Sequence, residues 1–130
     1  MDVTGQDLTL AAIAKALGLL SARQEAISAN IANVNTPGYR RRDVNFAAQL
    51  REAVSAGSVS SKQERIAAVE GVRKNLLVDG SFFSRNDLGS VDIDREMAEE
   101  ARTQMMYNSF ARLASKRFRM YRMAIMDGRA

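Results

Sequence analysis

The stretch Leu10–Val34, LAAIAKALGLLSARQEAISANIANV, decides the fold. Apolar residues recur in it at alternating spacings of three and four, with Gln24 taking one place in the row. A heptad pattern of this length is typical of a helix that packs against other helices as in a coiled coil. The residues of this seam are Leu10, Ile13, Leu17, Leu20, Ile27, Ile31 and Val34. We therefore expect a helix over about residues 7–34, which the turn residues Thr36–Gly38 bring to an end.

A second long helix is predicted near the other end of the chain, over about residues 92–127. Asp92 and Asp94 are good N-cap residues, and Gly128 is a natural stop. The apolar residues of this helix do not lie on one stripe, so a single partner helix cannot cover them all. We expect the uncovered ones to meet other subunits. The residues assigned to this subunit interface are Met97, Met106, Phe110, Leu113, Phe118 and Met120.

The segment between the two helices, about residues 40–90, has a weak and mixed pattern. Asp43–Ala53 predicts a short helix, and the serine-rich stretch Ser55–Ser61 predicts a loop. Gly71–Phe83 predicts a short β-hairpin with an Asp-Gly turn. The expected fold class is thus mainly α. Two long terminal helices form a coiled-coil-like hairpin, and an irregular segment joins them within a single domain that spans residues 1–130.

The composition argues against an enzyme. The chain of 130 residues contains no cysteine and no histidine. Disulfides, thiol nucleophiles, the usual zinc sites and histidine acid–base chemistry are therefore excluded. No arrangement of carboxylates and lysines suggests a reactive site either. We expect no catalytic residue, no metal and no cofactor.

The most specific motif is NIANVNTPGY, residues 30–39. Its Asn-Thr-Pro-Gly part, taken alone, predicts only a turn. Asn30 and Asn33 lie three apart on one helical face, where their amides can bond to a neighbour or to the turn that follows. The whole string resembles the N-terminal signature of the flagellar axial proteins, the family of rod, hook and hook-associated proteins. The residues that carry the resemblance are Asn30, Ile31, Ala32, Asn33, Thr36, Pro37, Gly38 and Tyr39.

Within that family the chain is most similar to the short rod proteins of the basal body, and among these to the proximal rod members. Distal rod and hook proteins are longer and carry an added domain between the helices. The resemblance extends over nearly the whole chain. The further stretches that carry it are Ser21–Glu25, Tyr39–Asp43 with Phe46, Val91–Met97, Gln104, Tyr107 and Lys116–Arg119.

The resemblance implies a structural subunit of the proximal rod of the bacterial flagellar basal body, required for flagellum assembly and motility. It implies self-assembly with other rod proteins, with the rod–MS-ring adaptor and with the membrane ring, and no nucleic acid. It also implies export by the flagellar type III apparatus to the periplasmic rod. Met1–Thr4 lacks the basic start of a secretory signal, which agrees with that route. Phe46 and Leu50 have the Phe-x-x-x-hydrophobic form of an export-gate element, a pattern loose enough to arise by chance.

Two alternatives from other classes follow from the basic end of the chain. The aromatic residues Phe118 and Tyr121 are interleaved there with basic ones, as in a small basic helical DNA-binding protein. The basic residues are Arg112, Lys116, Arg117, Arg119 and Arg122. Such a protein would bind duplex DNA in a salt-dependent way, whereas a solvated helix face would not. A peripheral membrane-surface helix is the second alternative, and it would gain helix on anionic vesicles.

Overall fold

The computed structural model describes residues 8–56, 61–71, 76–78 and 91–128. Its elements are α1 (Leu8–Ala32), β1 (Arg42–Val44), α2 (Phe46–Ala56), α3 (Lys62–Gly71), β2 (Leu76–Val78) and α4 (Ile93–Asp127). The two long terminal helices pack together, and a small two-stranded antiparallel sheet lies in the middle segment. The predicted fold class is therefore confirmed.

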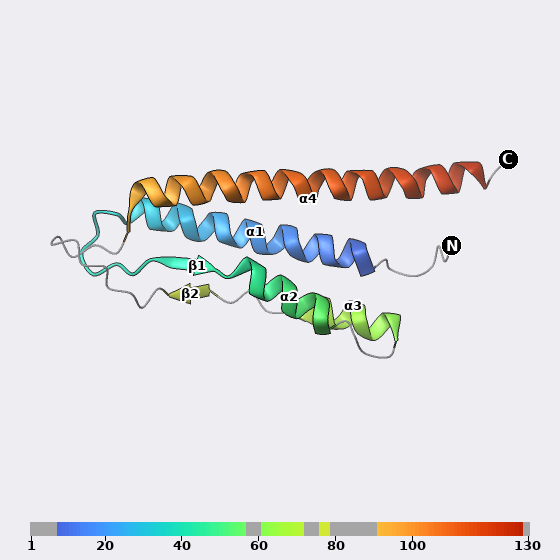
Figure 1. Cartoon of the computed structure of the whole chain (residues 1–130), viewed down its shortest axis with the longest axis horizontal. Coiled ribbons are helices and arrows are strands. Elements are labelled where there is room, and N and C mark those ends of the chain that lie inside the picture. The colour runs from blue at the N-terminus through green and yellow to red at the C-terminus, as the bar shows by residue number, and fades with distance from the viewer. Residues whose placement is uncertain (1–7, 57–60, 72–75, 79–90, 129–130) are drawn as a thin grey trace.

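Helix α1 is the central element of the molecule. It lies between α4 on one side and β1, α2 and α3 on the other (Figure 1). This position explains its burial. Of the predicted seam, Ile13, Leu20 and Ile27 are buried, whereas the other four members are half-buried. Four apolar residues outside the seam are buried as well, because α1 has a second covered face. They are Ala16, Leu19, Ala22 and Ala26.

The core joins α1 to the middle segment and to α4. Val44 and Phe46 pack on the buried residues of α1, and α4 closes the cluster from the other side. The rings of Phe46 and Phe110 meet edge to face, with their centroids 6.0 Å apart. This geometry is the favoured one for an aromatic pair. The partly buried residues packed against the core are Leu50, Met106, Tyr107 and Phe110.

The predictions for the middle segment were partly wrong. Asp43 lies in β1, and the helix begins only at Phe46, where the side chain of Asn45 accepts a hydrogen bond of 3.1 Å from the backbone N–H of Ala48. This helix continues to Ala56, so it includes part of the predicted loop. An N-cap asparagine fixes the start of α2 better than its apolar pattern does.

Helix α3 was not expected, and a capping box explains its start. The Ser61 hydroxyl accepts a hydrogen bond of 3.2 Å from the N–H of Glu64, and the Glu64 carboxylate accepts one of 3.1 Å from the N–H of Ser61. This reciprocal pair satisfies two backbone donors at the helix start. Ile66 and Val69 are buried where α3 packs against α1 and α2.

The predicted hairpin over Gly71–Phe83 was also partly wrong. Gly71 ends α3, and the strand Leu76–Val78 pairs with β1 in an antiparallel arrangement. The register brings Arg42 opposite Val78 and Val44 opposite Leu76. The Asp-Gly turn proposed for the hairpin lies outside the described residues.

Helix α4 is the longest element. Its N-cap Asp92 accepts hydrogen bonds from the N–H groups of Asp94 and Arg95 at 3.0 and 3.4 Å, and Gly128 caps its end. With 35 residues against the 25 of α1, it is longer by ten residues, or about 15 Å at the rise of an α-helix. Its C-terminal part extends past the start of α1 (Figure 1). None of the helices in the described ranges is long and apolar enough to cross a membrane.

Candidate functional site

The side chain of Asn30 joins three elements at the last turn of α1. It is completely buried. Its Nδ2 group donates to the Arg42 carbonyl oxygen at 2.7 Å and to Glu96 Oε2 at 2.9 Å. Its Oδ1 atom accepts from the Arg42 N–H at 2.8 Å and from the Tyr39 hydroxyl at 3.2 Å. The amide pairs with both backbone groups of Arg42, as a neighbouring strand would, and all four of its hydrogen-bonding positions are used.

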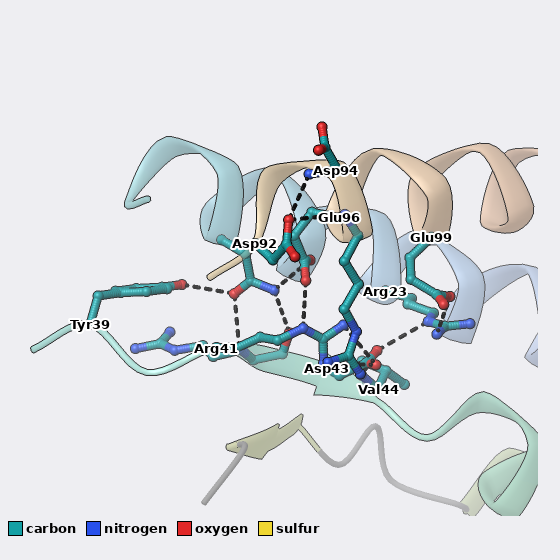
Figure 2. A network of polar contacts seen from close by, with 12 residues as sticks. Arg23, Tyr39, Arg41, Asp43, Val44, Asp92, Asp94, Glu96 and Glu99 are labelled. Atoms are coloured by element: carbon teal, nitrogen blue, oxygen red, sulfur yellow. Dashed lines mark hydrogen bonds and ion pairs between the residues drawn. The ribbon is translucent and has the colours of Figure 1, made fainter. Parts of the chain in front are cut away.

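A buried ion pair lies next to this amide. Glu96 of α4 is completely buried, and its Oε1 atom accepts a short hydrogen bond from Arg41 Nε (Figure 2). Arg41 is also buried, and its two terminal nitrogens each approach Asp43 Oδ2 at 3.3 Å. Burial by itself lowers the pKa of the Arg41 guanidinium, but the hydrogen bond and charge of Glu96, together with Asp43, outweigh it and raise that pKa. Arg41 is therefore a permanent cation that neutralises the buried carboxylate.

The ion pair continues into a half-buried network along α1 and α4. Arg23 of α1 donates to Asp43 Oδ1 and to Glu99 Oε2, both at 3.0 Å. The amide of the next residue, Gln24, donates to Gln104 Oε1 at 2.7 Å. Ion pairs therefore link α1, the strand and α4 in one connected network, and the dashed lines in Figure 2 mark the contacts between its charged residues.

The remaining motif residues build the turn that leads from α1 to the strand. Asn33 Nδ2 donates to the Ala29 carbonyl at 2.8 Å, and its Oδ1 accepts from the Thr36 hydroxyl at 3.2 Å. Gly38 has a φ of 73°, in the left-handed region that glycine adopts most easily. The Tyr39 ring then lies against the Arg42 guanidinium, with 5.9 Å between its centroid and Cζ. The two asparagines thus have different roles: Asn33 closes its own helix, and Asn30 binds other elements.

Sequence reasoning found one half of this site. It singled out the motif asparagines and the turn, but Arg41 and Glu96 entered only within stretches that resemble the rod proteins, and neither was given a structural role. A buried glutamate needs a partner, yet nothing in the local pattern of α4 shows that Glu96 is buried. Within the described ranges, no group of acidic side chains could hold a metal ion. The arrangement has no reactive group and is suited to fixing the three elements relative to one another.

The residues assigned to a subunit interface fall into two groups. Met106 and Phe110 pack against the core of the chain itself, so they contribute less surface than expected. The other four remain exposed on α4. Their exposed fractions are 58% for Met97, 45% for Leu113, 58% for Phe118 and 41% for Met120.

The residues of the candidate export-gate element lie on the first turns of α2. Phe46 and Leu50 are four residues apart and therefore share one face of the helix. Phe46 is 7% exposed, and Leu50 is partly buried against the same core. In the folded chain both side chains therefore contact the core.

The similarity of this chain to known proteins includes the motif residues of this site. A family model described as flagella basal body rod protein matches residues 11–40, which include most of α1 and the motif. The chain is 31% identical to the flagellar basal body rod protein FlgB of Borrelia hermsii, over 84% of this chain and 89% of that protein. It is 34% identical to FlgB of Salmonella typhimurium, over 72% of this chain and 75% of that protein. It is 49% identical to FlgB of Escherichia coli over a shorter stretch, 33% of this chain and 31% of that protein.

Proposed function

The chain belongs to the FlgB family of flagellar basal body rod proteins, and from this premise we propose that it builds the proximal part of the rod. It is a structural subunit of the basal body and not an enzyme. In the proposed role it assembles with further copies, with other rod proteins, with the rod–MS-ring adaptor and with the membrane ring. Loss of the subunit then prevents flagellum assembly and motility.

The observation that carries this proposal is the exposed apolar surface of α4. Leu113 and Met120 are seven residues apart, and so are Phe118 and Ile125, and all four side chains are at least 41% exposed. At about 100° per residue, each pair forms a row along the helix, and the two rows are about 140° apart. One partner helix cannot cover both rows. Neighbouring subunits on two sides of α4 would cover them.

We also propose that the chain reaches the periplasmic rod through the flagellar type III export apparatus. Family membership supports this route. Phe46 and Leu50 are proposed as an element that the export gate reads, and their packing in the core means that the gate would read it before the chain folds.

The alternative of a small basic DNA-binding protein has no support from these findings. The relatives named above are rod proteins. The basic residues of α4 also alternate with large exposed apolar side chains, which suit contacts with protein better than contacts with phosphates.

The assembly proposal is tested in a strain that lacks this gene. Electron microscopy of basal bodies from that strain is expected to show the membrane ring without rod, hook or filament. Complementation with Phe118→Asp should fail to restore the rod, although the purified variant keeps the wild-type circular dichroism and melting temperature. Asn108→Asp adds a charge to an exposed position on the same helix and should restore motility. Complete flagella in the deletion strain without a substituting paralogue, or full motility with Phe118→Asp, would overturn the proposal.

A further inference from the structure

The two buried residues of α4 are both polar, and only one of them needs a partner from elsewhere. Thr103 donates its hydroxyl to the Glu99 carbonyl at 2.7 Å, one turn back in the same helix. That bond persists wherever α4 lies. Glu96 takes its hydrogen bonds from Asn30 and Arg41, which belong to other elements. Its burial is therefore tolerable in one arrangement of the chain.

The apolar contacts between α1 and α4 restrict the position of α4 along α1 less strictly than the polar contacts of Glu96 do. The seam of α1 presents aliphatic side chains at all of its positions except Gln24, so a slip of α4 by seven residues exchanges mostly one aliphatic contact for another. Among the buried residues of α1, Asn30 is the polar one. A slip by seven residues moves Glu96 away from Asn30 and leaves both groups buried without each other.

The strand adds a third constraint. Asn30 binds both backbone groups of Arg42, so the position of β1 is tied to the same amide. This placement brings the preceding residue, Arg41, to the free oxygen of Glu96. The Glu96 side chain of α4 is therefore bound at one point both by the Asn30 amide of α1 and by the Arg41 cation of the strand segment.

We propose that Asn30, Arg41 and Glu96 form a register clamp, a set of positioning residues that fixes where α4 lies along α1. The clamp thereby sets the length of α4 that extends past the start of α1. A slip of one heptad changes this length by about 10 Å, which is most of the extension itself. It would bring Leu113 and Phe118 to different positions relative to the body of the subunit. The inference concerns the folded chain alone and does not rest on the proposed place in the rod.

The register can be measured by the distance between two spin labels. The chain has no cysteine, so Ser28→Cys and Arg119→Cys introduce two unique and exposed attachment sites. Because Gln24 lies opposite Gln104, residue 28 is level with about residue 100, and Arg119 lies about 30 Å further along α4. Pulsed electron paramagnetic resonance on the otherwise unchanged chain should give one narrow distance near this value.

The decisive variant is Glu96→Leu combined with Arg41→Met. It replaces the buried ion pair by apolar side chains of similar size, and Asn30 keeps its bonds to Arg42. We expect helix content to be retained and a second distance, shifted by about 10 Å, to appear. A single unchanged distance would show that apolar packing alone fixes the register and would overturn the proposal.

A matched control removes the half-buried ion pair at the same interface. Arg23→Met with Glu99→Leu should leave the single narrow distance, because these side chains are partly exposed and can find water. A second distance in this control would mean that no separate clamp exists. If the double Glu96 variant does not fold, Glu96→Gln takes its place, since it keeps the size of the side chain and removes the charge that Arg41 pairs with. A second distance in Glu96→Gln supports the clamp, and a single unchanged distance rejects it.

Discussion

Asn30 and Glu96 are 66 positions apart, yet both are completely buried and the Asn30 amide donates a hydrogen bond of 2.9 Å to the Glu96 carboxylate. A buried carboxylate is tolerated only where hydrogen bonds and an opposite charge replace water. Asn30 supplies the first and Arg41 supplies the second. The motif asparagine is thus part of the reason why a charged residue can be buried at the end of the helical hairpin where α1 ends and α4 begins.

Removal of the Asn30 amide is expected to destabilise the chain strongly. Asn30→Ala leaves one oxygen of the buried Glu96 and the partly buried backbone groups of Arg42 without these partners. We expect the free energy of unfolding to fall by about 3 kcal/mol or more. Asn33→Ala removes contacts within one helix end and its turn, for an expected loss of about 1 kcal/mol. Urea unfolding followed by circular dichroism compares the two, and equal losses would contradict the different roles assigned to these asparagines.

The contribution of the Arg41 side chain to the stability of the folded chain is predicted to depend on pH only in the alkaline range. Its pKa is raised above the ordinary value, so the folded state binds the proton more tightly than the unfolded state does. Stability from such a cation is complete below the unfolded pKa and is lost as pH rises through the folded pKa. For arginine that window lies in the strongly alkaline range, so wild-type stability should show no loss from this group near neutral pH.

In Arg41→Lys, the pH range over which the cation at position 41 loses its contribution to stability should lie lower than in the wild type. A lysine has an unfolded pKa of about 10.4, so a lysine paired with Glu96 loses its contribution as pH rises past that value. The difference in unfolding free energy between wild type and Arg41→Lys is therefore expected to widen between about pH 8 and pH 11. Chemical denaturation at both pH values measures it. A constant difference would mean that position 41 does not pair as a cation.

Gly38 is expected to be sensitive to a side chain for conformational reasons alone. It has a φ of 73°, and a Cβ at this position would meet no atom within 4 Å. Gly38→Ala should therefore lower the unfolding free energy by about 1 kcal/mol through backbone strain. Gly71→Ala is the matched control, because Gly71 also has open space around it and has no positive φ. A loss at Gly71 equal to that at Gly38 would show that strain is not the cause.

The two long helices could be predicted because their signals are local. A heptad row, a capping aspartate and a turn glycine each act within a few residues, and the observed ends of α1 and α4 lie within two residues of the expected ones. The second buried face of α1 could not be predicted in the same way. Ala16 and Leu19 are buried because the middle segment folds back on them, and the path of that segment depends on contacts between distant residues.

The candidate site likewise has features that the local sequence predicts and features that depend on contacts between distant residues. The turn at Gly38 and the bond of Asn33 to its own helix follow from the local motif. The pairing of Asn30 with Glu96 depends on the register of α1 against α4, which a repeating apolar pattern leaves open. The start of α3 is a different case. Ser61 and Glu64 form a capping box that is visible in the sequence, but the serine-rich stretch before it predicts a loop and obscures that signal.

The contact between Phe46 and Phe110 provides a test of the proposed export element. The two rings touch each other in the core, so Phe46→Ala and Phe110→Ala both remove the same aromatic pair. Each should lower the unfolding free energy, by about 3 kcal/mol for the more buried Phe46 and by less for Phe110. Only Phe46 belongs to the proposed gate element.

Export should therefore separate the two variants. The amount of chain that the flagellar apparatus secretes is expected to drop strongly for Phe46→Ala and to stay near the wild-type level for Phe110→Ala. The secreted amount is divided by the cellular amount, so that a lower abundance of the less stable Phe46→Ala is not counted as a loss of export. Immunoblots of secreted and cellular fractions measure the ratio. Equal secretion of the two variants would leave Phe46 with a role in packing alone, whereas a parallel drop for Leu50→Ala would assign the second position of the element.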